Sequence, residues 1–405
     1  MKLMTGIASL LIAASAFGQT TKPAAAPTPP VFTLAWSEYP SWSAFGAAAE
    51  LGLINGEKGK LGSIEQKYGV DIELQFFDYD TCIQSYNTSK CDAVCITNID
   101  ALPLVHGRKG VIVLPTSTSY GGDALIVPSN IATVADMKGS TVHGLGKSVS
   151  QYVFTAILEA NNMPINSVTF NSMDPGVVSQ ALQVKDKNVV NGMLWYPMVA
   201  DTLDKRKDMR ALETSRIVPF HVIDSVMFGA DALSREGGNN AAEAICETYY
   251  KLNEMLADKT HTDEVLIKIS EKFCNVGLAS MRNIVQQVRF FGTVEQGVSV
   301  ISGEPLFAEG NTLTIGKQQN KDGVVLASHR GSSIQNIMNE VVARCNRIGI
   351  LEGNVTIGYG STSEARANEL CFDPQYMIAT VPETPRMHFH PSPGNSPPLR
   401  KQPAK

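Results

Sequence analysis

The chain has 405 residues, of which 43% are hydrophobic and 18% are charged, and its formal net charge at pH 7 is −5. This length and apolar content exceed what one hydrophobic core usually buries, so they indicate a folded protein of two lobes. The acidic balance excludes the broad basic surface that nucleic-acid binding requires, and no nucleic-acid partner is expected.

Both ends of the chain are typical of processed or unfolded segments. Residues 1–18 combine a positive start, an apolar stretch and a small-residue site at Ala16 or Gly18, which predicts a cleaved secretory signal peptide. No cysteine follows that site, which argues against a lipid anchor, and no later segment has about 18 uninterrupted apolar residues. The proline-rich stretches 19–30 and 381–405 predict a flexible linker and a disordered tail. We therefore expect a periplasmic or secreted protein.

Apolar runs that suit strands alternate with helical patterns along the folded part of the chain. Such alternation is typical of a parallel, doubly wound sheet, because each helix carries the chain back to the start of the next strand. The expected strands are 31–35, 71–77, 93–97, 111–114, 124–127, 141–144, 167–171, 192–195 and 225–229, and the expected helices are 44–53, 81–89, 148–159 and 178–184, with a helix-rich region over 240–294.

Two polar stretches, 116–123 and 219–224, predict crossings between the lobes, and two crossings make a hinge. The predicted fold class is α/β, a two-lobed arrangement in which each lobe is a doubly wound, mostly parallel sheet flanked by helices, with a cleft between the lobes. The expected parts are lobe 1 over 31–118 and 225–380, including a C-terminal extension over about 303–380, and lobe 2 over 119–224.

The seven cysteines are an odd number, so at least one thiol is free even if an exported protein forms disulfides. Proximity in sequence allows two bridges, Cys82 with Cys91 and Cys345 with Cys371. Cys91 and Cys95 have a spacing that metal sites also use, but their apolar surroundings favour a buried strand in which cysteine acts as a small hydrophobic residue.

The three tryptophans lie in two short segments that follow strand-like runs. Trp36 and Trp42 come after the first expected strand, and Trp195 ends a much later one. Because ligands bind at the ends of strands in open α/β sheets, these indoles predict the walls of a recognition cleft. Ordinary packing in the core is the alternative that these positions alone leave open.

Eight motifs follow one another along nearly the whole folded chain. They are Ala35-Trp-Ser-Glu-Tyr-Pro-Ser-Trp42, Phe77-Asp-Tyr-Asp80 with Tyr86, Cys91-Asp-Ala-Val-Cys-Ile-Thr-Asn-Ile-Asp-Ala-Leu102, Ser119-Tyr-Gly-Gly-Asp-Ala124, Asp136-Met-Lys-Gly139, Ser148-Val-Ser-Gln-Tyr152, Leu194-Trp-Tyr-Pro197 and Cys371-Phe-Asp-Pro-Gln-Tyr-Met377. Together they resemble type II periplasmic solute-binding proteins of the nitrate/taurine group of ABC transporter receptors, most closely the subgroup encoded beside urea carboxylase-like enzymes. The chain departs from that pattern at Tyr120, Gln151, Tyr196 and His221, and 303–368 matches least.

The resemblance implies a type II periplasmic binding protein fold and a receptor with no chemistry of its own. Such a receptor closes its lobes around a small-molecule solute and presents it to a membrane ABC permease. The resemblance also implies a monomer that needs no cofactor and no metal. A binder that works without a transporter is an alternative.

Ligand-binding residues are expected where the motifs meet strand ends, the crossings and the start of a helix, since these places expose backbone and side chains to a cleft. The predicted set is Trp36, Ser37, Tyr39, Trp42, Asn98, Ser119, Tyr120, Gly122, Asp123, Ser148, Ser150, Tyr152, Trp195, Tyr196 and Asp224.

Several of these residues have a simpler structural role as an alternative. Ser148 can cap the helix that it precedes, and Asp100 can cap the helix after its own strand. The stretch 119–123 can be a plain hinge turn, and Asp224 can be a surface residue at the return crossing.

Charge in the expected cleft segments distinguishes between ligand classes. Nitrate or a sulfonate needs arginine, lysine or many donors to offset desolvation, whereas indoles and carboxylates suit a planar cation or a neutral amide. The sequence therefore predicts a small nitrogen-containing solute such as urea, guanidine or an amidine, with an anion of the nitrate/sulfonate type as the alternative. The count is six acids, Glu38, Asp78, Asp80, Asp100, Asp123 and Asp224, against one base, Lys147.

The alternative of another class is an enzyme related to the thiamine-pyrimidine synthases. It would need a reactive lysine or a histidine cluster in the cleft, and Lys147 is the sole lysine of the cleft segments. The only close pair of histidines, His388 and His390, lies in the proline-rich tail. We therefore expect no enzymatic activity.

Overall fold

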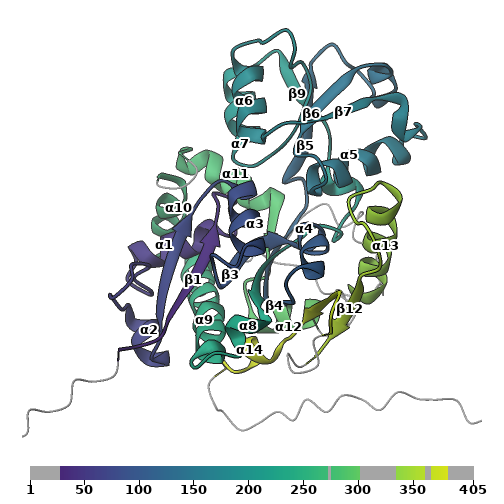
Figure 1. The fold of residues 1–405 in the computed structure, drawn as a ribbon. Coiled ribbons are helices and arrows are strands. Elements are labelled where there is room, and N and C mark those ends of the chain that lie inside the picture. The colour runs from purple at the N-terminus through teal and green to yellow at the C-terminus, as the bar shows by residue number, and fades with distance from the viewer. Residues whose placement is uncertain (1–27, 272–274, 302–333, 361–365, 382–405) are drawn as a thin grey trace, which may run out of the picture.

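The computed structural model describes residues 28–271, 275–301, 334–360 and 366–381. The expected signal peptide, most of the expected linker and nearly all of the expected tail lie outside these residues. Among them, the strands form two mixed sheets, each in its own lobe, and Figure 1 shows the two lobes one above the other. No helix in this part of the chain combines the length and apolar character of a membrane span.

The sheet of lobe 1 has the strand order β12-β13-β4-β10-β3-β1-β2, with β11 also paired to β4. Its two long central strands, β4 and β10, are buried along their whole length. The strands are β1 (Val31–Trp36), β2 (Asp71–Phe76), β3 (Ala93–Thr97), β4 (Gly110–Ser119), β10 (Ile223–Gly229), β11 (Val288–Phe290), β12 (Thr356–Tyr359) and β13 (Glu369–Phe372).

The sheet of lobe 2 has the order β7-β6-β8-β5-β9. Every residue between β5 and β9 in sequence belongs to this lobe or to its connections, so one stretch of chain inserts a complete sheet between β4 and β10. The strands are β5 (Asp123–Pro128), β6 (Thr141–Gly144), β7 (Thr169–Ser172), β8 (Gly192–Trp195) and β9 (Met209–Thr214).

The structure confirms the predicted α/β class and adds one feature that the strand pattern did not reveal. β10 pairs antiparallel with both β3 and β4, and β5 pairs antiparallel with both β8 and β9. These are the strands on which the chain arrives after a crossing, so each enters its sheet against the direction of its neighbours. The pairs β1–β2, β1–β3, β6–β7 and β6–β8 are parallel, as expected.

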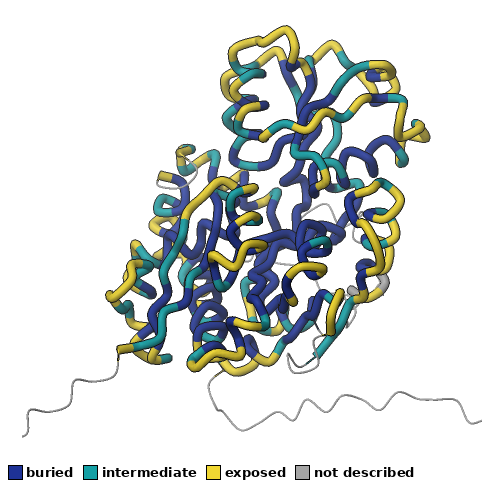
Figure 2. Tube along the Cα trace, viewed as in Figure 1, coloured by how far each residue is buried: buried dark blue, intermediate teal, exposed yellow. Residues whose placement is uncertain are grey.

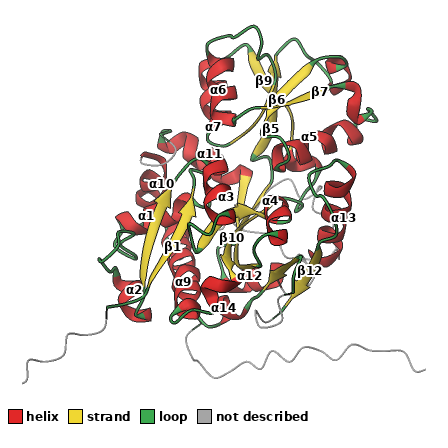
Figure 3. Cartoon of the chain, viewed as in Figure 1, coloured by secondary structure: helices red, strands yellow, loops and turns green. Residues whose placement is uncertain are grey.

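Helices flank both sheets, as the cartoon in Figure 3 shows. The long helix α9 packs against α1, α2, α10 and β4. The helices are α1 (Ser43–Glu50), α2 (Ser63–Tyr68), α3 (Tyr79–Asn87), α4 (Asn98–Ala101), α5 (Val149–Ala160), α6 (Pro175–Gln183), α7 (Met198–Lys205), α8 (Ala230–Leu233), α9 (Gly238–Ala257), α10 (Thr262–Ile269), α11 (Leu278–Gln287), α12 (Val294–Ile301), α13 (Ile334–Arg347) and α14 (Gln375–Ile378), with short 3₁₀ turns at Pro103–His106, Val134–Met137, Ile165–Ser167 and Ser215–Ile217.

Burial is concentrated in the sheet of lobe 1 and along the crossings (Figure 2). β3 is buried at all five positions, which explains its uninterrupted run Ala-Val-Cys-Ile-Thr, since a strand covered on both faces has no solvent side on which to place polar residues. The crossing segments are also buried, from Thr116 to Asp123 and from Phe220 to Asp224. Two covered connections thus join the lobes.

Helix α13, in the expected C-terminal extension, reaches across to lobe 2. Arg344 and Arg347 both pair with Glu159 of α5, at 3.2 and 2.6 Å, and Lys147 pairs with Glu352 at 3.0 Å. Figure 1 shows α13 beside α5. A third element therefore connects the lobes besides the two crossings.

The two disulfides that the cysteine spacing allowed are not formed. The six cysteines within the described residues are free and buried, and Cys274 lies outside them. Cys82 directs its thiol to the Phe77 carbonyl, and Cys371 directs its thiol to the Gly360 carbonyl. Cys95 lies inside β3, as expected for a small hydrophobic residue, and burial raises the pKa of its thiol well above the usual value.

Candidate functional site

A small pocket lies where the two lobes meet. Lobe 1 contributes residues that follow β1, begin α3 and end β3, together with the return crossing, and lobe 2 contributes the first residues of β5 and α5 and the last of β8. All of them are buried, so the cleft is shut in this structure. The lining residues are Tyr39, Trp42, Tyr79, Thr97, Asp123, Val149, Trp195, Val222 and Asp224.

Four aromatic rings form a continuous wall. Tyr39 and Trp42 lie 4.9 Å apart between ring centroids, Trp42 stacks on Tyr79 at 5.3 Å, and Tyr79 meets Trp195 edge-on at 5.7 Å. The first three rings come from lobe 1 and the fourth from lobe 2, so this wall is complete only when the lobes are together. Its faces offer the negative side of the ring quadrupole to a bound cation.

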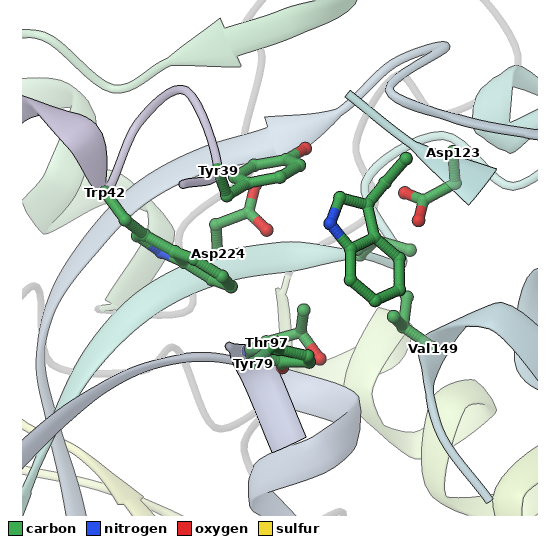
Figure 4. A pocket seen from close by; sticks show the side chains of 9 residues that line it. Tyr39, Trp42, Tyr79, Thr97, Asp123, Val149 and Asp224 are labelled. Atoms are coloured by element: carbon green, nitrogen blue, oxygen red, sulfur yellow. The ribbon is translucent and has the colours of Figure 1, made fainter. Parts of the chain in front are cut away.

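Two carboxylates complete the pocket, Asp123 from lobe 2 and Asp224 from lobe 1. In Figure 4 Asp224 lies below the Tyr39 ring, and Asp123 lies farther to the right. Ser119 donates to one oxygen of Asp123 at 2.6 Å, and Ser117 donates to one oxygen of Asp224 at 2.5 Å. The Tyr39 hydroxyl also acts on Asp224, since its hydrogen bond lowers the pKa of that carboxyl against the effect of burial. Each carboxylate thus has acceptor capacity left for a ligand.

The Tyr39 hydroxyl and the Trp42 indole nitrogen are further polar groups of the pocket. Both atoms are buried, and the indole nitrogen has no hydrogen-bond partner within the described part of the chain. Burial, followed by the charges of Asp224 and Asp123, raises the pKa of Tyr39 well above its usual value. A tyrosine that stays protonated can donate to, or accept from, a polar ligand.

A third buried carboxylate, Asp100, lies behind this wall. Its oxygens accept from the Tyr79 hydroxyl at 2.7 Å, the Thr97 hydroxyl at 2.9 Å and the Val149 amide at 3.0 Å. Burial raises the pKa of Asp100 to about 6, and the three donors hold it below the value that burial alone would give. Asp100 therefore adds negative charge to the region without lining the cavity.

Two acidic side chains and no basic side chain line the pocket. None of its lining residues is lysine, arginine or histidine. Burial raises the pKa of Asp123 to about 6 and raises that of Asp224 well above its usual range, and repulsion between the carboxylates adds to both shifts. Burial thus disfavours the ionised form of both carboxylates, and a positive ligand would favour it.

Five of the fifteen predicted site residues line the pocket. Each has an aromatic or acidic side chain and lies at a crossing or near the end of a strand. They are Tyr39, Trp42, Asp123, Trp195 and Asp224.

Three further predicted residues support the pocket from behind. Ser119 fixes Asp123, as described above. The Asn98 side chain holds the return crossing against the end of β3, because it donates to the His221 carbonyl at 3.0 Å and accepts from the Ile223 amide at 2.8 Å. Gly122 lies so close to the Ser119 and Tyr39 oxygens that an added Cβ would come within 2.8 and 2.9 Å of them.

The other predicted residues lie outside the lining. Trp36 packs on Phe76 at 4.8 Å, and Tyr120 packs under the guanidinium group of Arg289. The Tyr152 hydroxyl bonds the His221 ring at 2.6 Å. Ser37, Ser148, Ser150 and Tyr196 likewise do not line the cavity.

Ser148 takes the simpler of the two roles that its sequence position allowed. It is the N-cap of α5, where its side chain accepts from the Ser150 amide at 3.2 Å and donates to the Leu145 carbonyl at 2.7 Å. Asp100 does not cap its own helix α4, since Thr97 does so. The capping role that the sequence allowed for Asp100 is therefore wrong. Its carboxylate instead accepts a hydrogen bond from the first residue of α5, in the other lobe.

Four residues that line the pocket were not predicted from the sequence: Tyr79, Thr97, Val149 and Val222. Tyr79 and Thr97 stand inside two of the quoted motifs, and both follow or end a strand of lobe 1, which was the available signal. Val149 and Val222 contribute apolar surface and carry no chemical signal.

Within the described residues, no three histidine, cysteine or acidic side chains gather closely enough to hold a metal. Lys147, the one lysine of the cleft segments, is exposed at the surface and pairs with Glu352. The pocket therefore offers neither a metal cluster nor an amine nucleophile among these residues.

No protein-family model matches the sequence, and a search of curated proteins found no match. Solved structures are similar. The alkanesulfonate-binding protein of Xanthomonas axonopodis pv. citri, bound to MOPS, is 16% identical with a TM-score of 0.54, over 65% of this chain and 85% of that chain. The periplasmic nitrate-binding protein of Synechocystis PCC 6803 is 12% identical with a TM-score of 0.55, over 81% and 84%.

A third similar structure is a Candida albicans protein described as having the generic periplasmic binding protein fold. It is 12% identical with a TM-score of 0.54, over 80% of this chain and 92% of that chain. Sequence identities this low speak to architecture alone. The chain has the two-lobed α/β fold of periplasmic binding proteins.

Proposed function

We propose that this protein is an exported receptor that captures a small nitrogen-rich cation or amide, of the guanidine, amidine or urea kind, by closing its lobes. The observation that carries this proposal is the pocket itself, in which Asp123 and Asp224 face a wall of aromatic rings and no basic residue lines the space. The fold supports capture by closure.

A planar cation matches these groups in two ways. Its face can lie against an indole, an interaction that contributes about 0.5 to 2 kcal/mol. Its edges carry N–H donors that reach the carboxylates, and hydrogen bonds to charged groups contribute about 1.5 to 3 kcal/mol each. Guanidinium and amidinium ions combine a flat face with donors on opposite edges, as carboxylates from the two lobes require.

An anion of the nitrate/sulfonate type fits the pocket less well. It would enter a closed space that contains Asp123 and Asp224 and has Asp100 directly behind its wall. Two of the similar structures bind such anions according to their descriptions, so the fold accommodates that class. The charge of the lining side chains favours the opposite class here.

The remaining parts of the proposal rest on the resemblance and the fold. The receptor would act as a monomer outside the cytoplasm, without a cofactor, and would hand its solute to a membrane ABC permease. An enzymatic role is not favoured, because Lys147 pairs at the surface and no histidine lines the pocket.

A thermal-shift screen tests the ligand class, since a ligand that binds only the native state raises the melting temperature. We expect guanidine, amidines or urea to raise it, and nitrate, taurine and alkanesulfonates to leave it unchanged. Stabilisation by those anions alone would overturn the proposal.

Calorimetric titration of two matched variants then tests the site. Asp224→Asn should weaken guanidinium binding about 10- to 100-fold, because it removes one charged hydrogen bond. Asp78→Asn is the control. It removes one negative charge at the surface, and the new amide can still cap α3. Equal affinity of the two variants would exclude Asp224 from the site.

A further inference from the structure

Asp100 joins residues of both lobes. It belongs to α4 of lobe 1 and is 3% exposed. One of its oxygens accepts from the hydroxyls of Tyr79 and Thr97, and the other accepts from the Val149 amide of lobe 2. All three partners line the pocket. One carboxylate thus fixes part of the wall and reaches across the cleft.

The contact in lobe 2 is made at the start of a helix. Val149 is the first residue of α5, a helix of 12 residues, and the first amides of a helix have no partner inside it. The cap residue Ser148 satisfies the Ser150 amide, and the Val149 amide is left to Asp100. Helix N-termini attract anions because their amides and the helix dipole both favour negative charge. Here the chain supplies that anion itself.

We infer that Asp100 is a specificity-determining positioning residue that acts as a built-in anion for α5. Since Asp100 and Val149 belong to different lobes, their bond forms as the lobes close, and it leaves the helix start without room for an anionic solute. The same carboxylate holds the Tyr79 hydroxyl and so sets one ring of the wall. This inference rests on the proposed function for the class of the ligand, but not for the contact itself.

The decisive experiment replaces the built-in carboxylate with a free one. In Asp100→Ala, formate can occupy the vacated position at the start of α5, and we expect formate to raise the melting temperature of this variant but not of the wild type. This readout uses no nitrogenous ligand, so it stands even if the proposed ligand class is wrong. The same shift in both proteins, or in neither, would overturn the inference.

A matched control separates this role from helix capping in general. Asp174 also accepts from an amide at the start of a helix of lobe 2, the Val177 amide of α6, but it is exposed and lies in the same lobe as its helix. We expect formate to leave the melting temperature of Asp174→Ala unchanged. A formate response of equal size in this variant would show that any vacated cap responds, and would contradict a special role for Asp100.

Binding measurements extend the test to selectivity. Asp100→Ala should bind guanidinium about 10- to 100-fold more weakly than the wild type, with recovery on addition of formate. Asp100→Asn keeps an oxygen for the Val149 amide, so it should fall between the two. If Asp100→Asn folds while Asp100→Ala does not, formate is added during refolding of the alanine variant. Recovery of folded protein supports the inference, and none opposes it.

Discussion

The clearest consequence of the pocket's chemistry is that ligand affinity depends on pH through the buried carboxylates. Burial raises the pKa of Asp123 from 3.8 to about 6, so this carboxyl is ionised at pH 7.5 but only about one-tenth ionised at pH 5. If a cation binds the ionised form, its affinity falls about tenfold over this interval from Asp123 alone. Asp224, whose pKa is also raised, adds to the loss.

Isothermal titration calorimetry with guanidinium between pH 7.5 and pH 5 measures this dependence. The ligand keeps its charge throughout, since the pKa of a guanidinium ion lies above about 12. Titrations in buffers of different ionisation enthalpy should also show protons released on binding near pH 6, because a bound cation lowers the pKa of its carboxylate partners. Asp123→Asn should remove the part of the pH dependence that comes from this residue.

Two outcomes would refute the reasoning. An affinity that does not change between pH 7.5 and pH 5 would mean that the carboxylates do not face the ligand. An affinity that rises as the pH falls would indicate an anion, because protonation of Asp123 and Asp224 would then remove repulsion. The sign of the dependence therefore decides between the two ligand classes.

Three further predictions follow from the same geometry. Without ligand, the protein should gain thermal stability as the pH falls from about 6 toward about 4, because acidic groups whose pKa is raised by folding destabilise the folded state when they ionise. Differential scanning calorimetry measures this change, and a loss of stability in that pH window would contradict the prediction. Trp195→Ala should weaken guanidinium binding, measured by calorimetry, about 2- to 30-fold. The control Trp36→Phe changes a tryptophan outside the pocket and should leave this affinity unchanged. Equal losses of affinity in the two variants would remove Trp195 from the site. Gly122→Ala places a methyl group against the Ser119 and Tyr39 oxygens, so it should shift Tyr39 and lower the affinity for guanidinium. It should also lower the free energy of unfolding, measured by chemical denaturation, by about 1–3 kcal/mol. Unchanged affinity would show that Tyr39 does not contact the ligand.

The secondary structure was accessible from the sequence because its signals are local. β3 and β6 have the bounds that their apolar runs predicted, and the helix expected after Ser148 begins at Val149. The antiparallel direction of β5 and β10 was not accessible, since it depends on which way the chain enters a sheet after a crossing. Periodicity shows that a strand exists and does not show its neighbours.

The residues of the site could be predicted from the sequence only in part, because local patterns do not show how segments pack together. Trp36 and Trp42 share one motif, yet Trp36 packs on Phe76 of the adjacent strand while Trp42 reaches the pocket from the start of α1. Only the five non-helical residues 37–41 separate the two tryptophans, and no pattern in the sequence distinguishes their roles. The role of Asp100 depends on a contact with Val149 in the other lobe, which only the packing of the lobes determines.

Closure of the lobes and selection of the ligand are connected by one energetic balance. Closing the empty protein at neutral pH buries Asp100, Asp123 and Asp224, and the effective penalty for burying an unpaired ion is several kcal/mol. The ion pairs between α13 and Glu159 contribute only about 0–1 kcal/mol each, because they are partly exposed, so they offset little of that penalty. A cation between Asp123 and Asp224 offsets much more, whereas a neutral amide supplies hydrogen bonds without charge. Guanidinium should therefore close the receptor more firmly than urea, and the charge that makes the pocket selective also keeps it from closing without its solute.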